Sequence, residues 1–189
     1  DRVRVVDPSG VIGTLLVDGE TSFLEPVESY EGQPVRSASG IFIESGAIYV
    51  ADSARGRVSS VDESGVSTVL AGGGQGGVDG EVATNVPLRL PSDLFVESDG
   101  TLYIADCGDH KVRRVDGANG TISTVAGTGR PKFDGDGSEA ILGSLTNPSD
   151  VFVDSEGDLY IADENNYRIR KVAAGTGILS TLVGNGDYA

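Results

Sequence analysis

Three short stretches of this chain share one pattern: Tyr49-Val50-Ala51-Asp52, Tyr103-Ile104-Ala105-Asp106 and Tyr160-Ile161-Ala162-Asp163. The second follows the first by 54 residues, and the third follows the second by 57. Each is preceded by a turn that contains an acidic residue, Ser and Gly, and each is followed within a few residues by a basic–aliphatic pair. Self-similarity at a period of about 50 residues is typical of repeat architectures, so the chain is predicted to consist of repeated units.

Each unit contains four short runs of alternating or β-branched residues separated by turn signals, which is typical of a four-stranded antiparallel sheet. The expected strands are 39–44, 47–52, 57–61 and 66–70 in the first complete unit, 92–97, 101–106, 111–116 and 121–126 in the second, and 149–154, 158–163, 168–173 and 178–183 in the third. Residues 1–17 supply only the last two strands of a preceding unit. No segment has the apolar stripe of an amphipathic helix, so the chain is predicted to be all-β.

A four-stranded sheet of this size cannot bury both of its faces alone, whereas stacking such sheets radially buries both and leaves few exposed edges. We therefore expect residues 1–189 to form one β-propeller region of four-stranded antiparallel blades. Its parts are a half-blade at 1–17 and complete blades at 39–70, 92–126 and 149–183. Loops of a propeller divide between two faces, and we expect the long loops 18–38, 71–91 and 126–148 to share one face with the turns 53–56, 107–110 and 164–167. That face is where we expect contacts with partners.

The residues that carry the pattern resemble the NHL-repeat family. The closest matches are Leu102 to Asp106, His110 to Arg113 and Ile122 to Gly127, and the connection from Phe133 to Pro148 is similar to the long blade linker of the bacterial and teneurin-like subtype. The resemblance extends over essentially the whole chain. Because propellers of this family usually close with about six blades, it implies three complete blades and one half-blade of a six-bladed ring. We therefore expect this sequence to be part of a longer parent chain, with the missing strands before Asp1 or after Ala189.

Phenylalanine recurs at one position of the first strand of each unit, as Phe42, Phe95 and Phe152. This is a departure from the family, which usually has a small residue there. A threefold recurrence at one strand position indicates packing between blades rather than stacking on a ligand.

Charge argues against a nucleic-acid partner. The chain has 29 acidic against 14 basic residues and a formal net charge of −15, which repels phosphate backbones. RNA binding, which occurs among NHL proteins, requires a basic face. No apolar run approaches the ~20 residues of a membrane helix, so we expect no membrane insertion.

Single copies of His and Cys exclude several kinds of catalytic site. His110 alone cannot form a zinc site of several imidazoles, and no Ser-His-Asp triad can be assembled without it. Cys107 excludes an internal disulfide, and its neighbours Asp106 and Asp109 disfavour the thiolate of a nucleophile. We interpret both residues as members of the turn between the second and third strands.

The recurring aspartates Asp52, Asp106 and Asp163 invite a catalytic interpretation because they end equivalent strands. A structural role is favoured, because an aspartate there can accept hydrogen bonds from turn amides and pair with the basic residue that follows. The expected basic partners are Arg57, Lys111 and Arg168.

Asp93 and Asp150 are the preferred candidates for a binding site. They stand where the family usually has Gly, which the first unit keeps as Gly40. The first strand of a blade lines the channel, so two carboxylates are expected at one mouth of it. The alternative is that both only cap the strand or lie in water, as most surface carboxylates do.

A weaker candidate is a calcium loop formed by Asp134, Asp136, Ser138 and Glu139, since alternating oxygen ligands can converge on a hard cation. The pattern lacks the central Gly and the final bidentate Glu of such loops, so a Gly-rich turn that starts the linker is the favoured interpretation. No other cofactor is expected.

The leading functional hypothesis is a non-enzymatic protein-binding or structural scaffold module of a larger assembly, extracellular or at the cell surface, which binds a protein partner or another copy of itself. The alternative is a metal-dependent propeller enzyme, similar to lactonases or lyases, with its site at the channel mouth. Asn119-Gly120-Thr121 forms an N-glycosylation sequon in a turn, which has meaning only for a secreted chain. Asn-Gly is also a favoured hairpin turn.

Overall fold

The computed structural model describes residues 2–6, 12–17, 37–62 and 66–187. These residues form one two-stranded sheet and three four-stranded sheets, in which strands that follow one another pair antiparallel. The two-stranded sheet pairs β1 (Arg2–Val6) with β2 (Ile12–Val17). We call the other sheets blades 1, 2 and 3.

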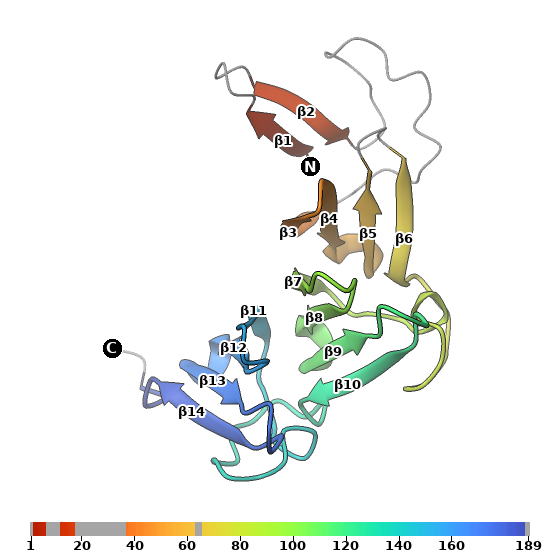
Figure 1. Cartoon of the computed structure of the whole chain (residues 1–189). Helices are drawn as coiled ribbons and strands as arrows, with labels where there is room; N and C mark the ends of the chain where they lie inside the picture. The colour runs from red at the N-terminus through yellow and green to blue at the C-terminus, as the bar shows by residue number, and fades with distance from the viewer. Residues whose placement is uncertain (1, 7–11, 18–36, 63–65, 188–189) are drawn as a thin grey trace.

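The blades have the same order of strands. Blade 1 consists of β3 (Ala38–Glu44), β4 (Ala47–Asp52), β5 (Arg57–Val61) and β6 (Ser67–Gly72). Blade 2 consists of β7 (Pro91–Val96), β8 (Leu102–Asp106), β9 (Lys111–Val115) and β10 (Ile122–Ala126). Blade 3 consists of β11 (Pro148–Val153), β12 (Leu159–Asp163), β13 (Arg168–Val172) and β14 (Leu179–Val183). In Figure 1 the blades follow an arc, with β3, β7 and β11 on its inner side and β6, β10 and β14 on its outer side.

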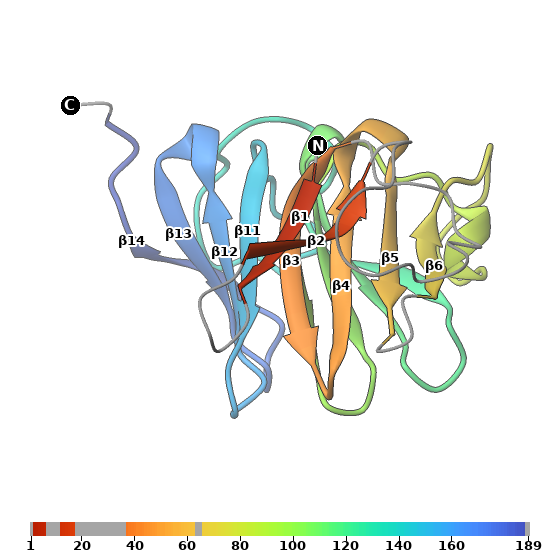
Figure 2. The ribbon, with the colours of Figure 1, turned by 90° about the horizontal axis from the view of Figure 1, so that it is seen from above.

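The strands begin and end within two residues of the ranges expected from the sequence. The expected division of the loops is confirmed by the strand register where the structure describes it, and residues 18–36 of the expected linker 18–38 lie outside the described residues. Ala38 pairs with Asp52 and Arg57 pairs with Gly72, so the long linkers and the turn between the second and third strands lie at the same end of the sheet. Figure 2 shows the strands from above, with their turns collected at the two ends. Across the described ranges, no helix has the length and apolar character needed to cross a membrane.

The turn between the second and third strands is built alike in each blade. It is a single turn of 3-10 helix, namely η1 (Ser53–Arg55), η3 (Cys107–Asp109) or η4 (Glu164–Asn166). The residue that ends each turn has a positive φ: 58° at Gly56, 55° at His110 and 53° at Tyr167. This left-handed conformation favours glycine, and the surrounding turn imposes it on His110 and Tyr167. A fourth 3-10 turn, η2 (Ala83–Asn85), lies in the linker before blade 2.

The two larger clusters of buried residues lie between blades, and a small third cluster, around Val50 and Val61, lies on the other face of blade 1. Ala51, Val58 and Ala71 of blade 1 pack against Leu94 and Ile104 of blade 2 in one cluster. A second cluster joins blades 2 and 3 through the equivalent residues, which are Ala105, Val112 and Ala126 on one side and Val151 and Ile161 on the other. Blade 2 therefore buries one face against blade 1 and the other against blade 3.

The innermost strands are joined by aromatic rings and by serine hydroxyls. The ring of Phe95 lies 4.9 Å from that of Phe42 and 5.1 Å from that of Phe152, in a tilted and an edge-on arrangement that such pairs favour. The hydroxyl of Ser39 donates to the carbonyl of Pro91 at 2.7 Å, and that of Ser92 donates to the carbonyl of Pro148 at 3.0 Å. The three phenylalanines thus pack between blades, as their recurrence indicated.

We expect Phe95→Ala to lower the free energy of unfolding by about 2 kcal/mol, because it removes the ring between two others and leaves a cavity at the joint of two blades. Phe152→Ala is the matched control, since its ring has the same strand position but is 53% exposed. Urea denaturation followed by circular dichroism measures both. Equal losses for the two variants would contradict the view that the rings act as inter-blade packing.

Candidate functional site

Asp52, Asp106 and Asp163 end strands β4, β8 and β12, and all three are buried. Each carboxylate accepts a hydrogen bond from a backbone N–H that lies just before the first strand of its blade. The donors are Ser37 at 3.1 Å, Arg89 at 2.6 Å and Thr146 at 2.6 Å, respectively. Each aspartate therefore ties the turn that follows it to the linker, which is the arrangement expected of a structural residue.

The basic partner of the aspartate differs from the expected one in two blades. Arg57 lies 3.9 Å from Asp52, as the sequence predicted. Asp106 and Asp163 instead face arginines two residues beyond the predicted Lys111 and Arg168. The two pairs are Arg113–Asp106 at 3.7 Å and Arg170–Asp163 at 3.3 Å.

The surroundings of the third strand explain why Arg170, and not Arg168, pairs with Asp163. Arg168 donates to the carbonyls of Asn166 and Asn185, and its guanidinium lies 3.7 Å from the ring centre of Phe133. Arg170, in contrast, is fully buried and points at the aspartate. Blade 1 has Ser59 at the position of Arg113, and Asp52 pairs there with Arg57 and, at 3.4 Å, with Arg55 of the turn.

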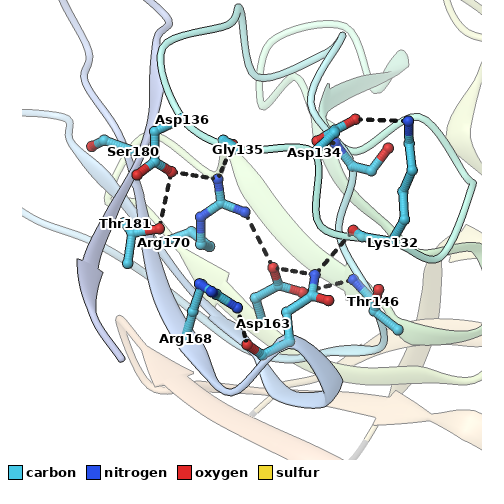
Figure 3. A network of polar contacts seen from close by, with 12 residues as sticks. Lys132, Asp134, Gly135, Asp136, Thr146, Asp163, Arg168, Arg170, Ser180 and Thr181 are labelled. Carbon is cyan, nitrogen blue, oxygen red and sulfur yellow. Dashed lines mark hydrogen bonds and ion pairs between the residues drawn. The ribbon is translucent and has the colours of Figure 1, made fainter. Parts of the chain in front are cut away.

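The buried arginines also hold the linkers. Asp79, in the linker before blade 2 (residues 73–90), pairs with Arg113 at 2.5 Å and accepts the N–H of Thr124 at 2.8 Å. Asp136, in the linker before blade 3 (residues 127–147), pairs with Arg170 at 2.9 Å and accepts the hydroxyl of Thr181 at 2.9 Å. Figure 3 shows Arg170 between Asp136 of the linker and Asp163 of the blade. Each linker is thereby bound to the third and fourth strands of the blade that follows it.

The aspartates of the candidate calcium loop have partners within the protein. Asp134 pairs with Lys132 at 3.3 Å and accepts the N–H of Ser144, while Asp136 faces Arg170. Burial raises the pKa of Asp136, but Thr181 and Arg170 outweigh it and hold the pKa below its usual value. Ser138 and Glu139 take part in backbone pairing with β14 and the segment before it. The two aspartates are thus held by cationic side chains and by donors of the protein.

Another group of carboxylates lies close together in the part of the chain that the structure describes: Asp154, Glu156 and Asp158, in the turn between β11 and β12. Asp154 accepts the N–H groups of Glu156 and Asp158 and the hydroxyl of Tyr160. Asp158 pairs with Lys171. Hydrogen bonds of the turn itself explain this grouping.

Blades 2 and 3 differ in one residue beside the buried aspartate. In blade 3 the amide of Asn166 donates to Asp163 at 2.8 Å. Blade 2 has Asp109 at this position, which removes the donor and adds a negative charge. Burial raises the pKa of Asp106 to about 7, and Asp109 adds to the shift, while the Arg89 N–H and Arg113 oppose it.

Asp93 and Asp150 are brought together, at equivalent positions of the innermost strands β7 and β11. The Asp93 carboxylate accepts the N–H of Val151 at 3.3 Å, across the joint between the blades. Burial raises the pKa of Asp93 to about 6; the Val151 N–H opposes the shift and the neighbouring Asp150 adds to it. Two close carboxylates in one site can share a proton or provide oxygen ligands to a cation. This pair is the candidate site for chemistry on the inner side of the arc.

A second feature, which the sequence did not lead us to expect, is an open hollow of about 520 Å³ between blades 1 and 2. It is lined by Ser53 to Gly56, by Leu88 to Leu90 and by Gly108. Leu90 is 58% exposed and has a φ of 54°, which is unusual for a leucine. The side chain of Arg89 is largely exposed beside it.

At the equivalent place between blades 2 and 3, side chains contact each other across the joint. Asn147, which has the position and the positive φ of Leu90, donates from its N–H to Nδ1 of His110 at 3.1 Å and from its amide to Sγ of Cys107 at 3.5 Å. Blade 1 has Gly56 at the position of His110, so no imidazole is there to accept the Leu90 N–H. The signal in the sequence was the pair of substitutions itself, Gly for His and Leu for Asn.

Asn119 lies exposed in the turn between β9 and β10. Its side-chain oxygen accepts the N–H of Thr121 at 2.9 Å and its hydroxyl at 2.6 Å. The turn is therefore well formed without a sugar, and glycosylation stays a prediction.

Comparison with known proteins identifies a repeat in the third blade. The family model of the NHL repeat matches residues 145–172, which span the start of blade 3 and its first three strands. The chain is similar to the protein SUPPRESSOR OF QUENCHING 1, chloroplastic, of Arabidopsis thaliana, with 31% identity over 80% of this chain and 14% of that protein. It is also similar to human teneurin-4, with 28% identity over 95% of this chain and 7% of that protein. The chain thus spans a small part of these relatives.

Solved structures share the fold at low sequence identity. The nidogen/laminin complex contains a chain that matches 97% of this one, over 54% of its own length, with a TM-score of 0.62 and 17% identity. Virginiamycin B lyase of Staphylococcus aureus matches 80% of this chain, over 43% of its own length, with a TM-score of 0.52 and 18% identity. The predicted fold class, all-β with the blades of a β-propeller, is confirmed.

We expect Asp93→Asn to stabilise the protein above pH 6 by about 1 kcal/mol, a value reduced for the part of the side chain that solvent reaches. Because the folded-state pKa of about 6 lies above that of an unfolded chain, ionisation of Asp93 costs stability as pH rises through it. The gain should vanish below about pH 4, where both states are protonated. Thermal unfolding of both proteins across this pH range measures the difference, and a gain that does not depend on pH would contradict the assignment.

Proposed function

Since the chain is built from NHL-type β-propeller blades, we propose that it is a non-enzymatic protein-binding module that acts as a scaffold within a larger assembly. The single observation that carries the proposal is the open hollow between blades 1 and 2. It lies on the face formed by the long linkers and the turns after the second strands, where propeller loops are free to vary.

The chemistry of the hollow suits a protein partner. It presents an exposed leucine, Leu90, and the largely exposed Arg89, while Arg55 in its lining is held by Asp52 at 3.4 Å. Apolar anchors beside arginine are typical of the residues that dominate binding energy at protein interfaces. A leucine held in a left-handed conformation costs the fold stability, and such strain persists at functional sites.

The repeated charged residues support a binding role over catalysis. The aspartates that end the second strands, and the arginines that face them, are buried and pair with one another and with backbone N–H groups. Their groups stabilise turns and linkers. The nidogen/laminin complex gives an example of a similar propeller in a structure of two different proteins.

We place this assembly outside the cell or at the cell surface. The support is the exposed sequon at Asn119, which has meaning for secreted chains. The relatives do not share one compartment, since the name of the Arabidopsis protein places it in the chloroplast. Absence of a glycan on the protein purified from its own source would speak against a secreted chain.

We expect Leu90→Asn to weaken partner binding at least about tenfold, the loss typical of a truncated anchor residue. The fold should be preserved or slightly stabilised, because Asn tolerates this conformation and Asn147 holds it in blade 3. The immobilised wild-type chain is exposed to extract of the source cells, a protein that it retains and a blank resin does not is purified, and the affinity of this protein for the wild type and for Leu90→Asn is measured by calorimetry.

Leu142→Asn is the matched control, because Leu142 is equally exposed but lies in the linker before blade 3, outside the hollow. It should bind the purified partner as the wild type does. A partner that binds wild type and Leu90→Asn with the same affinity would place the binding surface elsewhere. Failure of the wild type to retain any protein would remove the support for a binding module.

The second candidate function is a metal-dependent propeller enzyme, and the observation that favours it is the Asp93–Asp150 pair, in which the pKa of Asp93 is raised. Strongly perturbed carboxylates are enriched in active sites. Virginiamycin B lyase provides an example of an enzyme among the similar folds. An array of propeller blades does not by itself decide between binding and catalysis.

Calorimetric titration of calcium into the metal-stripped protein separates the two functions. The binding-module proposal predicts no stoichiometric uptake. Uptake that is lost in Asp93→Asn/Asp150→Asn but kept in Asp134→Asn/Asp136→Asn would favour the enzyme. The reverse pattern would indicate a structural ion in the linker.

A further inference from the structure

Asp106 of blade 2 has a buried carboxylate oxygen without a hydrogen-bond donor. Its side chain is fully buried, and Oδ1 accepts the Arg89 N–H at 2.6 Å. Within the described part of the chain, Oδ2 accepts no hydrogen bond, and Nη1 of Arg113 lies 3.7 Å away, beyond hydrogen-bonding distance. A buried acceptor that lacks a donor costs stability, and a carboxylate costs more than a neutral group.

The equivalent oxygen in blade 3 shows which donor is missing. Oδ2 of Asp163 accepts the side-chain amide of Asn166 at 2.8 Å and faces Arg170 at 3.3 Å. The arginines of the two blades are alike, since each also pairs with an aspartate of the preceding linker. The blades differ in the last residue of the 3-10 turn, which is Asn166 in blade 3 and Asp109 in blade 2. A carboxyl group can donate as the amide does only when it carries a proton.

We infer that Asp106 and Asp109 share one proton, which joins the two carboxylates as the Asn166 amide joins Asp163, and whose release is a pH-sensitive switch in the turn of blade 2. Asp109 follows Asp106 by three residues, as Asn166 follows Asp163, and its side chain is only 27% exposed. When two carboxylates occupy one site, repulsion keeps a proton on the pair to a higher pH. The titration then belongs to the pair rather than to either residue.

The charged groups around the two acids support this assignment. Those that face them are Arg89, Lys111 and Arg113, together with Asp79, which pairs with Arg113. Burial raises the pKa of Asp106 to about 7; the Arg89 N–H opposes this shift, Asp109 adds to it, and Arg113 and Lys111 oppose it. The guanidinium of Arg89 lies 3.8 Å from Asp109, but its side chain is 72% exposed, so solvent screens this pair.

The switch acts on the linker before blade 2. Arg89 is fixed to the turn by both of its backbone groups, because its N–H donates to Asp106 and its carbonyl accepts the Gly108 N–H at 2.7 Å. Asp106 ionises at higher pH in the folded chain than the pKa of ~3.9 in an unfolded one. Stability therefore falls as pH rises toward 7, and the loss is complete above it. Arg89 and Gly108 also line the hollow, but the switch belongs to the chain alone and requires no partner.

The test follows two backbone amides by NMR over about pH 5 to 8.5. The Arg89 N–H reports on Asp106, and the Thr146 N–H, which donates to Asp163, is the reference in blade 3. In the wild type the Arg89 signal should titrate with a midpoint near that of Asp106, and the Thr146 signal should stay constant. Asp109→Asn supplies the missing amide and should weaken proton binding at least about tenfold, which lowers the Arg89 midpoint. Asn166→Asp removes the amide from blade 3 and should make the Thr146 signal titrate.

Glu164→Gln is the matched control, because it removes one negative charge from the exposed part of the equivalent turn in blade 3. It should leave the Arg89 midpoint unchanged. Circular dichroism checks that each variant is folded, and Asp109→Ser replaces Asp109→Asn if that variant is not. An Arg89 signal that stays constant in the wild type overturns the inference. So does a titration that removal of the Asp109 charge leaves unchanged, because the proton then belongs to Asp106 alone.

Discussion

Each blade of this chain has an apolar surface on both sides of its sheet, and no single sheet can keep both sides from water. The consequence is visible in where the buried side chains meet. Ala51 and Val58 do not pack within blade 1 but against Leu94 and Ile104 of blade 2. Stability therefore resides in the joints between blades, and a blade is stable in so far as its neighbours cover it.

A buried carboxylate at the end of the second strand links the turn, the third strand and the linker of its blade to one another. In blade 3, Asp163 accepts a backbone N–H from the linker, an amide from its own turn and a guanidinium from the third strand. The same guanidinium, Arg170, then holds Asp136 of the linker. A buried charge pair gives little net stability compared with apolar packing, but it admits one arrangement of turn, strand and linker. The neighbouring residue of the turn determines how the carboxylate is stabilised: Asn166 donates a hydrogen bond to Asp163, whereas Asp109 places a second negative charge near Asp106.

The strands could be predicted from the sequence because each is marked locally, by a repeated Tyr-aliphatic-Ala-Asp stretch and by turns of Gly, Asp and Ser. The basic partners could not, because a register that places Lys111 opposite Asp106 does not say which long side chain reaches it. The cation that faces Asp136 could not be predicted for a similar reason. Asp136 has its cation 34 residues further along the chain, in Arg170, and a pattern of neighbouring acids contains no sign of that contact.

The hollow at Leu90 shows what repeats add to a structure. Two joints of the same design differ only in a few residues: Gly56 and Leu90 at one, His110 and Asn147 at the other. At the second joint the imidazole and the amide satisfy the backbone and fill the space. At the first, the same backbone keeps its left-handed conformation without either partner. The scaffold tolerates this loss because the apolar core of the joint lies deeper, between the sheets. The surface residues of a blade joint can therefore vary, and can become available for contacts with a partner, while the buried residues of the joint keep the two blades packed.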